Sequence, residues 1–202
     1  MLKCKSRFIS GFMCVVLILS AFQISVYATD SQASYVDYSG NVVYYYLDRN
    51  NQKYVIENGK KIYIAVPVST EKVTNEKELE ALKSSIDKPI NIGAEINAVN
   101  ILFSKTISLS YTTNVLTISQ PYLYLKCSNL SPSGAKRGFS YYVFYSPDNS
   151  TWFRELYVNE SLRTYTRHSN AHFGNGPYIK IHIWSYYGEV TSCSFNIKEA
   201  SV

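Results

Sequence analysis

The chain has few of the side chains that carry out catalysis. It holds three histidines in 202 residues, and 17% of its residues are charged. It contains no G-x-S-x-G or H-E-x-x-H sequence and no glycine-rich phosphate loop. Paired carboxylates for glycoside hydrolysis have no fixed spacing in sequence, so they stay open. Because the motifs that activate a nucleophile or a water molecule are missing, we expect a protein that is not an enzyme and needs no cofactor.

Histidine is also too sparse to predict a metal site. His168 and His172 lie in the Ser-, Asn- and Gly-rich segment 167–176, interpreted as an exposed loop in which their spacing has no fixed geometry. His182 falls on the polar face of a predicted strand beside Lys180 and is expected to be exposed. Zinc sites take three or four ligands at ordered spacing, so we expect no metal.

A strong net charge is missing as well, once the N-terminal segment is set aside. Three basic residues precede the apolar run Phe8–Phe22, and the small residue Ala28 follows. This pattern is typical of a secretory signal peptide at residues 1–28, and the run is shorter than the roughly 20 residues of a membrane-spanning helix. We therefore expect a secreted, extracellular protein, either released or held at the cell envelope, without an integral membrane segment after cleavage.

Without the three basic residues of that segment, 17 of the 20 remain against 15 acidic residues, a net charge of about +2. So small a charge argues against nucleic acid as a partner.

Cysteine is scarce outside the expected signal peptide. Of four cysteines, Cys127 and Cys193 remain after cleavage. In an exported chain two cysteines favour one disulfide, and the alternative is a pair of buried free thiols. Both residues fall on apolar faces of predicted strands, so burial is expected in either case.

What the chain does have is tyrosine, 19 in all, together with many β-branched residues. Residues 29–106 are predicted to form a β-meander with strands at Val42–Asp48, Lys53–Glu57 and Lys61–Val68. The Asn58-Gly59 pair predicts a type I′ hairpin turn, because both residues accept positive φ. The stretch 29–40 is polar and is expected to fray.

One helix is predicted over about residues 75–87. Asn75 is the expected N-cap, with Glu78 three residues later as in a capping box. Leu79, Leu82 and Ile86 form one apolar stripe, which we expect to pack on the meander.

Residues 107–202 are predicted to contain strands and no helix. Seven short strands at roughly even spacing, with turn signals between them, favour an antiparallel β-sandwich. They are expected at Val115–Ile118, Pro121–Cys127, Phe139–Ser146, Thr151–Leu156, Ser161–Tyr165, Tyr178–Trp184 and Val190–Ile197.

Two stretches carry a resemblance to a known family. YYVFYSPDNSTW (Tyr141–Trp152) resembles a hairpin of a fibronectin type III or related immunoglobulin-like domain, and Tyr178–Ile197 resembles the last two strands of such a domain. The similarity covers Val115–Ile197 and implies a binding or spacing module. In the family a tyrosine near the start of the penultimate strand points inward, whereas here Tyr178 alternates with three isoleucines and is expected to point outward.

Aromatic residues on strand faces are the remaining candidates for a site. Tyr178, His182 and Trp184 share the polar face of one predicted strand, and Tyr122 and Tyr124 that of another. Such rows can contact a carbohydrate or anchor a protein partner at the cell surface, although tyrosine is also simply frequent in strands. We expect a non-enzymatic binding module. A structural accessory protein that assembles with itself or with a secreted partner is the main alternative, and a small secreted hydrolase is a third.

Overall fold

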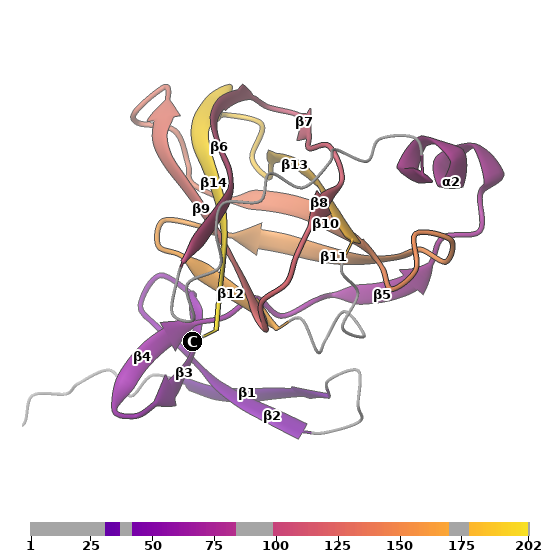
Figure 1. Ribbon diagram of the computed structural model, residues 1–202. Coiled ribbons are helices and arrows are strands. Elements are labelled where there is room, and N and C mark those ends of the chain that lie inside the picture. The colour runs from indigo at the N-terminus through magenta and orange to yellow at the C-terminus, as the bar shows by residue number, and fades with distance from the viewer. Residues whose placement is uncertain (1–30, 37–41, 84–98, 170–177, 202) are drawn as a thin grey trace, which may run out of the picture. The chain divides into compact units, whose positions relative to one another are not determined.

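The computed structural model describes residues 31–36, 42–83, 99–169 and 178–201 (Figure 1). The predicted signal peptide, His172 and Ile86 lie outside the described residues. Within them the protein is mainly β, with antiparallel strand pairing and one short helix. The elements are β1 (Ser31–Val36), β2 (Val42–Leu47), β3 (Lys53–Glu57), β4 (Lys60–Tyr63), β5 (Ser69–Lys72), α2 (Glu76–Lys83), β6 (Asn100–Ser108), β7 (Tyr111–Thr112), β8 (Leu116–Thr117), β9 (Tyr122–Ser131), β10 (Phe139–Ser146), β11 (Phe153–Glu160), β12 (Thr166–Ser169), β13 (Tyr178–Ser185) and β14 (Ser192–Ala200).

The strands form three sheets. The N-terminal sheet has the order β1-β2-β3-β4. The β10 sheet has the order β5-β11-β10-β13-β7, with β8 also paired to β13, and the β9 sheet has the order β12-β9-β14-β6 (Figure 1). In the described part of the chain, no helix is long and apolar enough to span a membrane.

The β10 and β9 sheets share one apolar core. Ile179, Ile181 and Ile183 of β13 are fully buried, and so are Leu123 and Leu125 of β9. Side chains alternate between the two faces of a strand, so the neighbours of these residues point away from the core. The predicted faces of both strands are confirmed, and the two sheets pack in the manner of a sandwich.

A second apolar cluster lies on the outer face of the β10 sheet, beneath α2. Leu82 of the helix packs there with Val73, Phe144 and the fully buried Trp152. The expectation that the helix stripe packs on the meander is wrong, because strand β5 carries the chain onto the β10 sheet by pairing with β11 before the helix starts.

The N-terminus of α2 has the predicted cap. The Asn75 Oδ1 atom accepts a hydrogen bond of 3.1 Å from the Glu78 backbone N–H. The Glu78 carboxylate accepts one of 3.1 Å from Nη1 of Arg154 on β11. Glu78 therefore ties the helix to the sheet below it.

The N-terminal sheet contains the predicted meander and one additional strand. Asn58 and Gly59 both have positive φ, 50° and 72°, as the predicted turn requires. The expectation that residues 29–40 fray is wrong for β1. Its polar sequence shows no apolar alternation, but its backbone pairs with β2. At the other edge, Ile64 forms a parallel bridge with Arg167 of β12, so the meander adjoins the β9 sheet.

Three further details of the C-terminal part differ from expectation. The strand predicted at Ser161–Tyr165 is displaced to β12, because Leu162 takes a positive φ of 45° and breaks the extended chain. β6 was not predicted. The last two strands do not pair with each other: β13 lies in the β10 sheet and β14 in the β9 sheet. In immunoglobulin constant domains the last two strands are neighbours in one sheet, so this pairing departs from the resemblance.

Candidate binding surface

Tyr178, His182 and Trp184 lie on the outer face of the β10 sheet and are half-buried. Tyr178 packs against the cluster beneath α2. The Trp184 ring lies 5.4 Å from the rings of both Tyr142 and His182. These side chains therefore contact the protein's own elements over much of their surface.

His182 is held by two hydroxyl groups across the β13–β7 pairing. Ser110 Oγ lies 3.2 Å from Nε2, and Thr112 Oγ1 lies 2.7 Å from Nδ1. Burial lowers the pKa of His182 below its usual value, which favours the neutral ring. A serine–histidine hydrolase places a carboxylate at Nδ1 to stabilise the imidazolium, and here a threonine hydroxyl occupies that place. The expectation that His182 is exposed is wrong, since the strand that pairs with β13 covers part of the ring.

Tyr122 and Tyr124 lie on the outer face of the β9 sheet, as the alternation of β9 predicts. Cross-strand pairing brings Tyr124 opposite Lys198 of β14 and Arg167 of β12. The next outward residue of β9, Lys126, lies opposite Asn196. The outer face of the β9 sheet therefore combines tyrosines with three cationic side chains.

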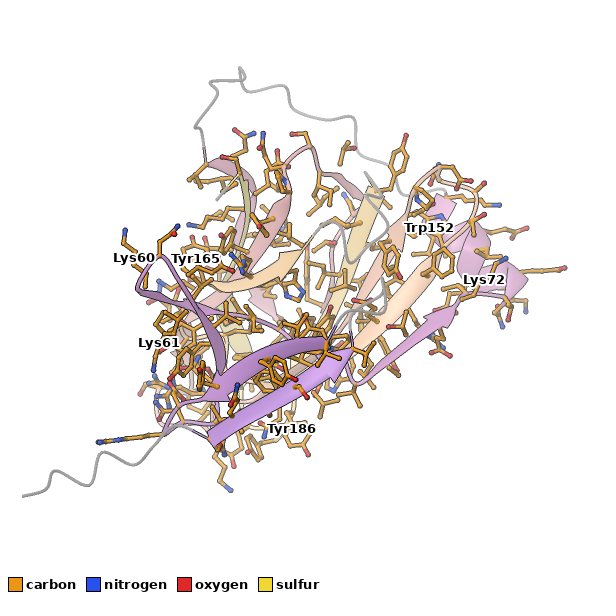
Figure 2. All side chains as sticks on the ribbon, turned by 90° about the horizontal axis from the view of Figure 1, so that it is seen from below. Lys60, Lys61, Lys72, Trp152, Tyr165 and Tyr186 are labelled. Carbon is orange, nitrogen blue, oxygen red and sulfur yellow. The ribbon has the colours of Figure 1, made fainter. Side chains whose placement is uncertain are left out.

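Two of these cations are positioned on tyrosine rings. The Lys198 Nζ atom lies 3.8 Å from the ring centre of Tyr165 and 5.3 Å from that of Tyr124. Lys126 Nζ lies 5.4 Å from the ring centre of Tyr165, which Figure 2 labels. Burial, and secondarily the charge of Lys126, lowers the pKa of Lys198. The two ammonium groups are thus close enough to repel each other, and no carboxylate among the described residues forms an ion pair with either of them.

The third cation is neutralised within the protein. Both guanidinium Nη atoms of Arg167 donate hydrogen bonds to the Glu57 carboxylate. The Arg167 guanidinium lies 4.5 Å from the ring centre of Tyr122. This hydrogen bonding holds the pKa of Glu57 below its usual value. Among the described residues, Lys126 and Lys198 are consequently two cations of this face that no carboxylate neutralises.

A polar network is buried beside the core, and sequence reasoning missed it. The Tyr157 hydroxyl donates to Oε2 of the fully buried Glu155 at 2.5 Å, and the Tyr141 hydroxyl lies 3.2 Å from Nε2 of His168. The rings of Tyr141 and Tyr157 stack with their centres 4.9 Å apart, so the two contacts lie side by side. Burial raises the pKa of both tyrosines well above the usual value.

The exposed-loop interpretation is wrong for His168. Its side chain is enclosed because β12 pairs with β9, and the residue is 3% exposed. A network this enclosed offers no surface to a ligand, so it contributes to the fold. Among the described residues, no three His, Cys, Asp or Glu side chains gather in a way that could hold a metal ion.

Cys127 and Cys193 are both buried, as expected, and the structure holds them as free thiols. Burial raises the pKa of Cys127 well above its usual value, and the neighbouring Cys193 side chain raises it further. A neutral, enclosed thiol is a poor nucleophile. The disulfide has no support in the structure and stays a prediction.

Local patterns in the sequence indicate part of this surface. The alternation of residues along β9 places Lys126 on the same face as Tyr122 and Tyr124. The alternation of Ile197 with Lys198 could have placed the second lysine outward. Nothing in the sequence indicated that Tyr165 would lie beside both lysines, because it directly precedes β12, the strand that is displaced from its predicted position.

The site thus belongs to a mainly β protein with antiparallel sheets and an outward cluster of tyrosine and lysine. The sequence matches no protein family and no curated protein, and the structure matches no solved structure.

Proposed function

We propose that this chain is a secreted, non-enzymatic binding module, released or associated with the cell envelope, and that it binds a carbohydrate on the outer face of the β9 sheet. The observation that carries the proposal is the tyrosine–lysine cluster of Tyr124, Tyr165, Lys126 and Lys198. The outer face of the β10 sheet is a weaker candidate, because its aromatic side chains pack against α2 and β7.

The composition of this face suits a sugar. Tyrosine offers an apolar ring together with a hydroxyl that both donates and accepts hydrogen bonds. Beside the tyrosines the sheet presents amides and hydroxyls, including Asn196, whose Oδ1 accepts a hydrogen bond of 2.8 Å from Ser104. Asn129 Nδ2 donates to Ser194 Oγ at 3.1 Å on the same part of the sheet. A polyhydroxylated ligand needs such a mixture of ring surface and paired polar groups.

The proposed fold relationship is to the immunoglobulin-like sandwiches, as a variant. The β10–β11 hairpin, antiparallel and ending near the buried Trp152, supports it. The variant places the last strand, β14, between β9 and β6 in the opposite sheet.

A glycan array tests the proposal. The mature protein should bind a restricted set of glycans, and Tyr165→Ala should reduce that binding without changing the thermal midpoint by more than a few degrees. Tyr186→Ala is the matched control, because this tyrosine is 47% exposed and lies apart from Tyr165 (Figure 2). Loss of binding in both variants, or in neither, would contradict the proposed surface.

Self-assembly is a second candidate, supported by the outer face of the N-terminal sheet. Val36 pairs with Val42, and Tyr44 and Ile56 fall on the same face by alternation. All four are exposed by 52% or more of their surface. Exposed apolar patches on a sheet mark association sites. Light scattering tests this candidate: assembly would raise the mean mass with concentration, and Tyr44→Ser with Ile56→Thr would abolish the rise, whereas a monomer at all concentrations would exclude it.

A further inference from the structure

The charge pattern on the outer face of the β9 sheet indicates the charge of the carbohydrate that this face would bind. The mature chain is expected to carry about +2 net charge, and Lys126 and Lys198 are two cations that form no ion pair among the described residues. Two like charges held on one pair of strands repel each other, and a bound anion would relieve that repulsion.

The lysines are also positioned before any ligand arrives. The Lys198 Nζ atom sits 3.8 Å from the ring centre of Tyr165, and cation–π attraction holds it there. The Lys198 side chain is half-buried, so its ammonium group has lost part of its hydration, and this burial lowers its pKa. A partly dehydrated and immobilised cation loses less on binding an anion than a free surface lysine does.

We infer that the ligand is an acidic polysaccharide, a chain of sugars bearing carboxylates, with one carboxylate at Lys126 and another at Lys198. This inference rests on the proposed function above. The hydroxyl- and amide-bearing residues beside the lysines, including Asn196 and Ser104, would contact the sugar hydroxyl groups.

The number of free cations distinguishes this ligand from nucleic acid. Double-stranded DNA carries about one charge per 1.7 Å along its axis and is usually bound by many Lys and Arg side chains. Here Arg167 is already paired with Glu57, so it cannot bind a phosphate with both nitrogens. Two lysines suit a polymer with one charge per sugar.

The experiment compares two forms of one polymer. Oligogalacturonate and its fully methyl-esterified form have the same backbone, and esterification removes the charge. We expect calorimetry to show binding of the acidic form that weakens as salt is added, and binding of the ester at least about tenfold weaker, the combined effect of two exposed ion pairs.

Two double variants locate the charge. Lys126→Met with Lys198→Met removes both ammonium groups while keeping unbranched chains on the tyrosine rings, and it should weaken binding of the acidic form about tenfold. Lys72→Met with Lys77→Met changes the net charge equally at exposed lysines of β5 and α2 and should leave binding unchanged. Circular dichroism would verify that both variants keep the fold.

The outcomes separate the inference from the proposed function. Equal binding of acidic and esterified forms, unaffected by the lysine changes, would overturn the acidic ligand and leave carbohydrate binding intact. Equal lysine-dependent binding of duplex DNA or of poly(glycerol phosphate) would also overturn it, since the surface would then bind any polyanion. A protein that binds neither form, and no glycan on the array, would refute both.

Discussion

The outer faces of the β10 and β9 sheets have the same sequence pattern, in which aromatic residues alternate with buried aliphatic ones, but they have different surroundings. On the β10 sheet, α2 and β7 cover the outward side chains: Lys180 Nζ donates to the Ala81 carbonyl at 3.4 Å, and Tyr178 enters the apolar cluster under the helix. On the β9 sheet, the outward side chains contact one another, as Lys198 contacts Tyr124 and Tyr165. Alternation decides which residues leave the core, whereas the path of the chain decides whether anything covers them.

The largest expected effect tests the covered face. Trp152→Ala should reduce the free energy of unfolding by about 3–5 kcal/mol, because it empties the centre of the cluster beneath α2. Urea denaturation followed by tyrosine fluorescence measures the loss. A loss below about 1 kcal/mol would mean that the helix does not cover this face in solution.

A substitution in the core shared by the β10 and β9 sheets gives the loss of unfolding free energy with which substitutions on the outer faces are compared. Ile181→Ala should cost about 2–5 kcal/mol, since Ile181 is fully buried between the sheets. Its outward neighbour Trp184 is half-buried, and Trp184→Ala should cost about 1–2 kcal/mol. If Trp184→Ala proved the more damaging of the two in the same denaturation assay, the orientation of β13 would be reversed.

The attachment of the helix is open to a finer test. Asn75→Ala removes the side-chain acceptor for the Glu78 N–H and should cost about 1 kcal/mol. Asn75→Asp keeps an acceptor there and should be close to neutral. Equal losses in the two variants, measured by thermal denaturation, would show that the cap does not hold the helix.

The smallest effect concerns the Arg167–Glu57 pair at the edge of the β9 sheet. Arg167 lowers the pKa of Glu57 from its usual 4.5, so the stabilisation from this pair is present above that value and is lost as pH falls through the lowered pKa. An NMR titration of the Glu57 carboxyl carbon should give a midpoint below 4.5, and Arg167→Gln should return it to the usual range. A normal midpoint in the parent protein would mean that the pair is not formed in solution.

Local sequence patterns predicted much of the secondary structure, but they did not predict which elements pack over the outer faces of the sheets. The isoleucines of β13, the leucines of β9, the Asn58-Gly59 turn and the Asn75 cap depend on neighbouring residues, and all of them form as predicted. The outward directions of Tyr122, Tyr124 and Tyr178 follow from the same alternation. The position of α2, the pairing of β14 with β6 and the burial of His168 could not be predicted, because they depend on contacts between distant segments.

The sequence by itself determined a mainly β chain with two buried cysteines and outward tyrosines, since side-chain alternation along an extended strand requires only local geometry. The tertiary structure decided which tyrosine row packs beside a helix and which row lies among cations. Lys126, Tyr165 and Lys198 come from three separate segments, and strand pairing in the β9 sheet brings them together. Their shared charge and ring surface arise from that pairing, which no local pattern encodes.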